Sequence, residues 1–159
     1  MEMDVRGIHV KLKIKGYESS ENGSWDARWC KCDHAFCSGD WLNYHKEDDE
    51  ILLSCEVEEL EVSLTKLLND ELSEIKEICC MEPDYIFTLY PKKDLRKDPN
   101  YTYLQPGYEI KDICVEWKVY FWYEGLTNNF LTVTLKREEI IRYIFEQERR
   151  NRKKEKGLS

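Results

Sequence analysis

The stretch Ile-Cys-Val-Glu-Trp-Lys-Val-Tyr-Phe-Trp-Tyr at residues 113–123 decides the fold of this 159-residue chain. Apolar side chains occupy every second position from Ile113 through Trp117 to Tyr123, a period typical of a strand with one buried face. The intervening positions hold Tyr120 and Trp122, so aromatic side chains lie on both faces. We therefore expect a central strand that is either covered on both sides or presents an aromatic binding surface.

The residues after this strand predict a hairpin and then a helix. Residues 124–129 read as a loop, in which Asn128 and Asn129 can adopt left-handed conformations. Residues 130–135 then pair back on the central strand. A last helix is expected to begin near Arg137. Its inward-facing side chains are expected to be Ile140, Ile141, Ile144 and Phe145.

The residues before it predict two more strands and one long irregular segment. Residues 74–81 and 85–90 read as strands separated by a turn at Pro83. Residues 92–111 form the longest irregular stretch, with turn-forming sequences at 98–100 and 106–107. Both predicted strands precede this stretch, so it connects them to the central strand.

One helix is predicted further upstream, from Cys55 to about Asn69. Leucines and valines there are spaced for one helical face. Glutamates crowd the first turns, where the helix dipole favours negative charge. Ser54 is the expected N-cap residue.

The first fifty residues read as a series of strands. Apolar and basic side chains alternate from Ile8 to Ile14, and Gly16 is expected to end this strand. Residues 25–37 form a second extended stretch, and residues 41–45 are expected to start a third strand. The acidic run 47–50 is expected to be a turn, with extension resuming at residues 51–53.

These elements predict one α+β domain over residues 1–151, with a mostly antiparallel sheet and two helices packed against it. The basic tail, residues 152–159, lacks apolar anchors and is expected to fray. The local hairpins are the reason for expecting antiparallel pairing.

The charge balance narrows the classes of partner. The whole chain has a formal charge of −8. Residues 149–156 hold six basic residues and one acidic residue, so the remainder carries −13. Such a body repels nucleic acid and attracts basic surfaces. The chain shows neither a secretory signal nor a membrane-spanning stretch, and we expect a cytoplasmic protein.

The cysteines and histidines offer one metal-site hypothesis. The seven cysteines are expected to be free thiols, because their number is odd and no signal peptide is seen. Cys30, Cys32, His34 and Cys37 are zinc-ligand types, but alternate residues of a strand spread along it at about 6–7 Å and do not close a tetrahedron. We therefore expect buried thiols, no metal and no cofactor.

No catalytic motif is present: the seven glycines are isolated, and no histidine lies in a nucleophile motif. The candidate residues are instead acidic and aromatic, and suit a basic protein partner. The candidate partner-binding residues are Glu47, Asp48, Asp49, Glu50, Glu58, Glu59, Glu61, Tyr120 and Trp122. The simpler interpretation of the acidic residues is solubility.

Short motifs in this layout resemble a known family. They are Gly16-Tyr17, Trp25-Asp26, Val57-Glu58-Glu59-Leu60, Leu131-Thr132-Val133-Thr134-Leu135 and Arg137-Glu138-Glu139-Ile140-Ile141. With their order, they resemble the bacterial WapI-type immunity proteins over most of residues 5–147. The aromatic segment 101–108, the basic tail and Lys136 at a helix start depart from that pattern.

The resemblance implies a non-catalytic protein that neutralises a toxin domain by stoichiometric binding. Two alternatives remain open from the residues alone. One is an adaptor or subunit of a larger assembly, and the other is a metal- or thiol-dependent enzyme that uses residues 30–37. The oligomeric state and the identity of the toxin are left open.

Overall fold

The computed structural model describes residues 2–17, 28–82 and 84–143. Its strands form two four-stranded antiparallel sheets and a two-stranded ribbon. This confirms an α+β fold with antiparallel sheets, although the strands divide between two sheets where the sequence predicted one. The predicted tail, residues 152–159, lies outside the described residues.

Sheet A contains the N-terminal strands in sequence order. They are β1 (Glu2–Val5), β2 (Ile8–Tyr17), β3 (Trp29–Ser38) and β4 (Leu42–Leu53). The first pair is joined by Arg6 and Gly7, whose φ angles of 50° and 84° suit the tight hairpin turn that a right-handed strand twist favours. Strand β2 continues one residue past Gly16, because an irregularity in register between Ile14 and Gly16 carries the pairing on to Tyr17.

Strand β4 corrects the prediction of an acidic turn at residues 47–50. The strand runs unbroken through this segment and pairs with β3 on both sides of it. The register shifts between Cys32 and His34, and Asp48 has a φ angle of 52°. A bulge of this kind accommodates extra residues without ending the strand. The charged side chains therefore lie along the edge strand of sheet A.

Sheet B contains the later strands in the order β10, β9, β6, β5. Their bounds are β5 (Lys76–Cys79), β6 (Tyr85–Tyr90), β9 (Cys114–Trp122) and β10 (Leu126–Lys136). The central position predicted for residues 113–123 is confirmed, since β9 pairs with both β6 and β10. The left-handed residues of the β9–β10 turn are Glu124 and Gly125, and not the predicted Asn128 and Asn129.

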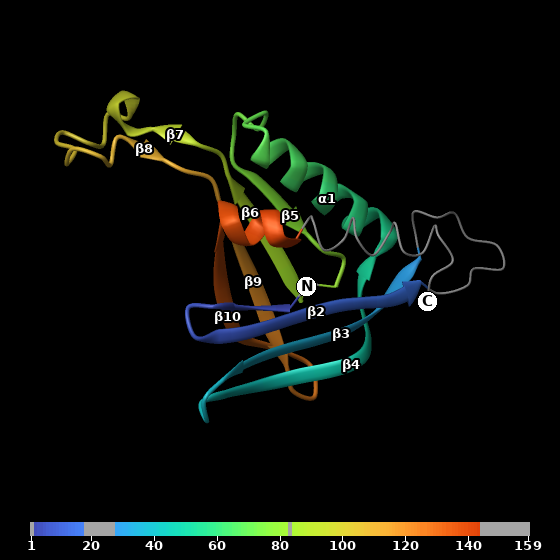
Figure 1. Ribbon diagram of the computed structural model, residues 1–159. Helices are drawn as coiled ribbons and strands as arrows, with labels where there is room; N and C mark the ends of the chain where they lie inside the picture. Colours follow the sequence, from blue (N-terminus) through green and yellow to red (C-terminus); the bar gives the residue numbers. More distant parts are fainter. Residues whose placement is uncertain (1, 18–27, 83, 144–159) are drawn as a thin grey trace.

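Between β6 and β9 the chain forms an arm, residues 92–111. It contains the ribbon strands β7 (Lys93–Asp94) and β8 (Ile110–Lys111), with a short 3-10 helix, η2 (Leu95–Lys97), after β7. Lys93 pairs with Lys111, so the ribbon extends the β6–β9 hairpin. The arm projects from the body of the molecule (Figure 1).

Helix α1 (Ser54–Leu68) follows β4 directly. Its N-cap residue is Leu53, one position before the predicted Ser54, and its backbone N–H donates to Glu56 Oε2 at 2.8 Å. The Glu56 carboxylate therefore acts as the N3 residue of a capping box, which accepts a hydrogen bond from the N-cap backbone N–H. A second helical segment covers residues 137–143, and there the Lys136 N–H donates to Glu139 Oε2 at 2.7 Å.

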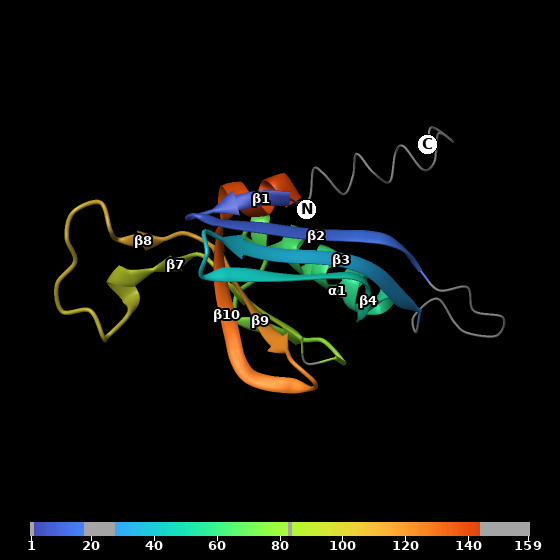
Figure 2. The same cartoon turned by 90° about the horizontal axis from the view of Figure 1, so that it is seen from below.

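One core cluster joins the two sheets and α1. The strands of the two sheets run across one another, and α1 lies along sheet B (Figures 1 and 2). Sheet A contributes Val10 and Phe36, sheet B contributes Trp117 and Leu89, and α1 contributes Leu67. The described part of the predicted inner face of the last helix includes Ile140, which is buried, and Ile141, which is half-buried; residues 144 and 145 lie outside it.

Candidate partner-binding site

Strand β9 places aromatic side chains on two different surfaces, as its alternation predicts. Trp117 faces the core and is fully buried, whereas Tyr120 and Trp122 on the opposite face are half-buried. In sheet B, Tyr120 is paired with Phe130 of β10, whose exposed fraction is 52%. Lys118 Nζ lies 4.9 Å from the Phe130 ring centroid and 5.9 Å from that of Tyr120. The outer face of sheet B thus presents aromatic rings to solvent.

Lys46 connects this strand to β4. Its Nζ lies 3.2 Å from Asp49 Oδ2 and 5.6 Å from the Trp122 ring centroid. The Trp122 backbone N–H donates to the Tyr44 hydroxyl at 3.4 Å. Two of the predicted binding residues, Asp49 and Trp122, are therefore brought together by a lysine that the sequence did not single out. We call Tyr44, Lys46, Asp49, Asp84 and Trp122 the inter-sheet cluster.

Asp84 is the buried carboxylate of the inter-sheet cluster. Only 4% of the residue is exposed, and burial raises its pKa to about 6 against the opposing effect of Lys46. Its backbone carbonyl accepts from the Tyr120 N–H at 2.8 Å, which fixes it beside β9. Its Oδ1 and the indole nitrogen of Trp122 are buried and have no hydrogen-bond partner among the described residues. Because both atoms are shielded from solvent, they are not accessible to a partner docking on the surface.

His34 lies beneath this cluster. The residue is 2% exposed, and its Nδ1 shares a hydrogen bond with the Tyr85 hydroxyl. Burial lowers the pKa of His34 to about 4, although Asp49, whose Oδ2 lies 3.5 Å from Nε2, favours the charged form. The imidazole is therefore neutral at physiological pH. It supports the inter-sheet cluster from within and is closed to a substrate.

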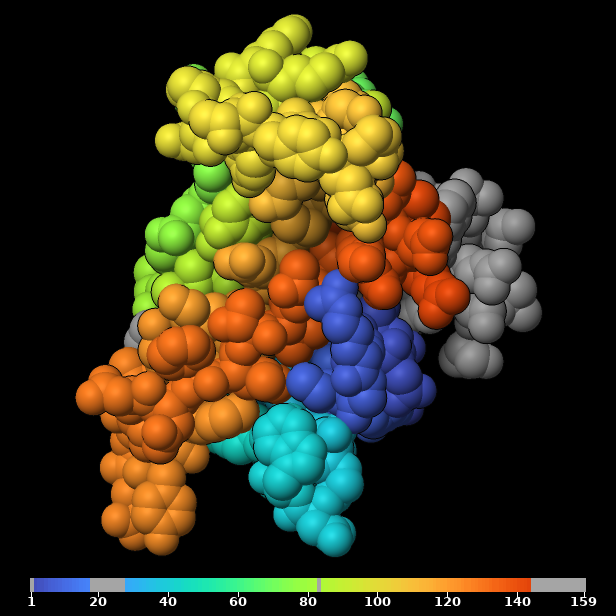
Figure 3. All heavy atoms as spheres, turned by 90° about the vertical axis from the view of Figure 1, so that its left-hand side faces the viewer, coloured from blue at the N-terminus to red at the C-terminus, as the bar shows by residue number. Residues whose placement is uncertain are grey.

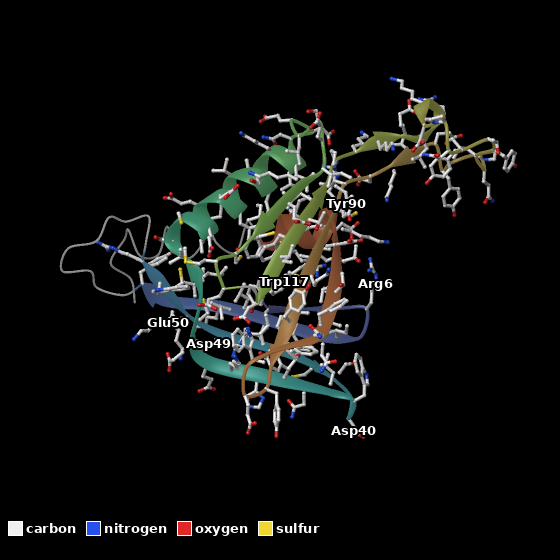
Figure 4. All side chains as sticks on the ribbon, turned by 180° about the vertical axis from the view of Figure 1, so that it is seen from behind. Arg6, Asp40, Asp49, Glu50, Tyr90 and Trp117 are labelled. Atoms are coloured by element: carbon white, nitrogen blue, oxygen red, sulfur yellow. The ribbon has the colours of Figure 1, made fainter. Side chains whose placement is uncertain are left out.

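The other acidic residues of β4 lie on the exposed side of the edge strand. Glu47, Asp48 and Glu50 are exposed, and Figure 4 shows Asp49 and Glu50 on this strand. Lys15 Nζ lies 2.8 Å from Asp33 and 3.0 Å from Asp48, so Asp48 is partly neutralised. Glu47 and Glu50 add two further exposed carboxylates on the same strand.

The acidic residues of α1 are less uniform than the sequence suggested. Glu58 and Glu59 are exposed, but Glu59 forms an ion pair with Lys76 at 2.9 Å. Glu61 is half-buried, and burial raises its pKa, with Glu58 adding to the shift. These three residues occupy a different element from the β4 set and are not part of the inter-sheet cluster.

The residues of the metal-site hypothesis lie on the predicted strand face. Cys30, Cys32 and His34 are all buried on the inner face of β3, whereas Cys37 is half-buried. Within the described ranges, no group of three or more His, Cys, Asp or Glu side chains has the arrangement that holds a metal ion. Burial raises the pKa values of Cys30 and Cys32 to about 12. These thiols are protonated and shielded, which opposes a nucleophilic role.

We expect seven free thiols after denaturation without reductant, because all seven cysteines are unbridged. In the native protein, exposed Cys79 should react faster than buried Cys30, Cys32 and Cys80. Titration with a thiol reagent before and after denaturation measures both values. A denatured count of five or fewer would contradict this expectation, and Cys79→Ser controls for the fast native fraction.

Sequence reasoning missed His34, Tyr85 and Lys46 as a connected set. His34 and Tyr85 are 51 positions apart, and their contact depends on the packing of sheet A against sheet B. The available signal was the position of His34 on the same strand face as Cys30 and Cys32, which marks it as buried.

Within residues 2–17, 28–82 and 84–143, no helix combines the length and apolar character that crossing a bilayer requires. The sequence pattern that describes the immunity protein WapI-like family matches residues 3–149. No curated protein and no solved structure matches the chain.

Proposed function

Since the chain belongs to the WapI-like immunity protein family, we propose that it binds a toxin domain in the cytoplasm and neutralises it stoichiometrically. The family match over residues 3–149 is the observation that carries this proposal. The family description supports an immunity function in general, and the surface described above supports the form that binding takes.

We propose that the contact surface combines the exposed acidic side of β4 with the aromatic outer face of β9. Lys46 links the two by contacting both Asp49 and Trp122. Tyrosine and tryptophan are enriched at protein interfaces, where one end of the side chain is buried and the other is hydrogen-bonded. In this proposal Tyr120 and Trp122 anchor the complex and set its dissociation rate.

The proposed toxin surface is basic. Glu47 and Glu50 on β4, with Glu58 on α1, supply long-range attraction that accelerates encounter. Glu61 contributes less, because its side chain is half-buried. Exposed charges separated by more than about 8 Å are screened at physiological salt, so association should slow as salt is added.

The first experiment identifies the gene next to that of this chain and co-expresses this chain with any toxin domain encoded there. Rescue of growth and a one-to-one complex in vitro would support the proposal. If the chain neither protects the cells nor forms a complex, the proposal is contradicted. The adaptor role would then be the favoured alternative.

The double variant Glu47→Lys/Glu50→Lys should lower the association rate constant about tenfold at low salt, because it reverses the charges that steer encounter. Its melting temperature should match the parent, since both residues are exposed. Stopped-flow or surface-binding kinetics over a salt series measure the effect.

The matched control is Glu74→Lys/Glu138→Lys, which changes net charge by the same amount at exposed positions outside β4 and α1. An equal loss of rate in both double variants would show that only net charge matters. That result would remove β4 from the proposed contact surface.

A further inference from the structure

The arm, residues 92–111, carries exposed aromatic side chains away from the core. The exposed fractions are 79% for Tyr103, 66% for Tyr108 and 48% for Tyr101. No residue between 94 and 110 belongs to the core cluster. Figure 3 shows the arm at one end of the molecule, beyond strands β9 and β10. Packing of the fold therefore does not account for these tyrosines.

The arm is held in shape by its own hydrogen bonds. The Leu95 N–H donates to the Glu109 carbonyl at 2.8 Å, which joins its two sides. The Arg96 guanidinium binds Asp94 through two hydrogen bonds of 2.9 and 2.8 Å, and Lys93 Nζ lies 2.6 Å from Asp98. A preorganised loop loses less conformational freedom on binding than a disordered one.

The charge of the arm is opposite to that of the body. It contains five basic and three acidic residues. Each of these acidic side chains accepts a hydrogen bond within the arm. Asp94 accepts from Arg96, and Asp98 accepts from Lys93. Glu109 accepts from the Gly107 N–H at 2.9 Å. The arm therefore presents phenol hydroxyls and the exposed Lys97 ammonium group toward solvent.

The arm and the surface proposed for toxin binding are connected through strand β9, with the arm at its Cys114 end and Trp122 at the other. Tyr90, labelled at its root in Figure 4, ends strand β6, and Lys111 Nζ lies 5.7 Å from its ring centroid. The Tyr90 hydroxyl donates to Glu116 Oε2 at 3.0 Å on β9, the strand that carries Tyr120 and Trp122. One hairpin thus bears both the sheet B aromatic face and the arm.

We infer that the arm is a second recognition element for the same toxin, and that it binds a surface rich in carboxylate and carbonyl groups. Rigid exposed tyrosines provide large contact area at low conformational cost and donate hydrogen bonds to such acceptors. Lys97 matches negative charge there. This inference rests on the proposed function and assigns specificity for one toxin to the arm.

The test compares the parent chain with an arm-deleted variant in which residues 94–110 are replaced by Asn-Gly. Lys93 and Lys111 are register partners, so this turn can close the hairpin. A point variant, Tyr103→Ala/Tyr108→Ala, keeps the arm backbone. The control is Trp41→Ala, because Trp41 is 69% exposed between β3 and β4, away from the arm.

Binding to the toxin domain identified by co-expression should weaken about tenfold in Kd for the double tyrosine variant. The arm deletion should weaken binding at least as much, and Trp41→Ala should leave Kd unchanged. Thermal melts should coincide for all four proteins, which shows that the loss is not due to unfolding.

Three results would overturn the inference. If the arm-deleted variant binds with the parent Kd, the arm is not a recognition element, while the proposed function stands. If the parent itself neither binds nor protects, the proposed function and the inference both fall. If light scattering shows a parent dimer and an arm-deleted monomer, the arm binds a second copy of this chain and not the toxin.

Discussion

Trp117→Ala is expected to lower the free energy of unfolding by about 3–5 kcal/mol, the cost of removing a large aromatic side chain from a packed core. Trp117 is fully buried where the two sheets meet. Its ring lies 5.2 Å from Phe36 of β3, 5.1 Å from Tyr85 and 5.6 Å from Phe87, measured between centroids. Alanine would leave a cavity bordered by both sheets, and neither can move inward without disturbing its own strand pairing.

Chemical denaturation of the parent and the variant measures this change. Trp122→Ala is the matched control, because it removes the same side chain from the same strand at a half-buried position on the opposite face. Its loss should be clearly smaller. Equal losses for the two variants would mean that burial of Trp117 does not set its contribution.

The second large effect concerns pH and His34. The pKa of its imidazole is about 4 in the folded protein, below the ordinary value of 6.5, because the ring is buried. As the pH falls below 6.5, His34 becomes protonated in the unfolded chain. In the folded protein it stays neutral until about pH 4. The unfolded state is thereby favoured, so His34 should reduce stability by about 3 kcal/mol between pH 7 and pH 4.

Asp84 acts in the opposite direction over part of this range. Its pKa of about 6 lies above the ordinary carboxyl value, so the folded protein binds a proton first as the pH falls. The parent alone would therefore show a reduced net effect. The informative quantity is the stability of the parent minus that of His34→Gln, in which an amide can still hydrogen-bond Tyr85.

That difference should fall by about 3 kcal/mol between pH 7 and pH 4, as measured by urea denaturation at each pH. Lys46, Asp49 and Asp33 also act on the His34 charge and remain in both proteins. The comparison in an Asp84→Asn background isolates the histidine. A difference that stays constant with pH would show that His34 is accessible to protons when folded.

The strands with regular alternation were predictable because strand period and burial are local properties. Residues 85–90 form β6 with the predicted bounds, and the buried positions of β9 follow its alternation. The resemblance to the WapI-type immunity family is likewise confirmed by the match over residues 3–149. These features depend on neighbouring residues or on the order of motifs along the chain.

The errors arose where distant contacts override local composition. Four consecutive acidic residues at 47–50 read as a turn, yet pairing with β3 and the bulge at Asp48 keep them in a strand. The division of the strands into two sheets was not predicted. Alternation shows that a strand has one buried face, but it does not show which sheet packs against that face.

The candidate site was predicted only in part for the same reason. Asp49 and Trp122 were named from composition, but Lys46, which contacts both, lies in a separate strand from Trp122. His34 and Asp84 are distinguished from other titratable residues only by their burial. That burial results from the packing of the two sheets against each other. The binding roles of the nine predicted residues remain predictions.

The strand orders of the two sheets have a consequence for synthesis of the chain. In sheet A every strand pairs with its neighbour in sequence, so the sheet can assemble once residues up to Leu53 are available. In sheet B, β5 and β6 can pair early, but the pairing of β6 with β9 must wait until the arm has been made. Local pairings form faster than distant ones. On the ribosome, Val10 and Phe36 should therefore remain uncovered until Trp117 emerges, which makes this interval the one most exposed to aggregation.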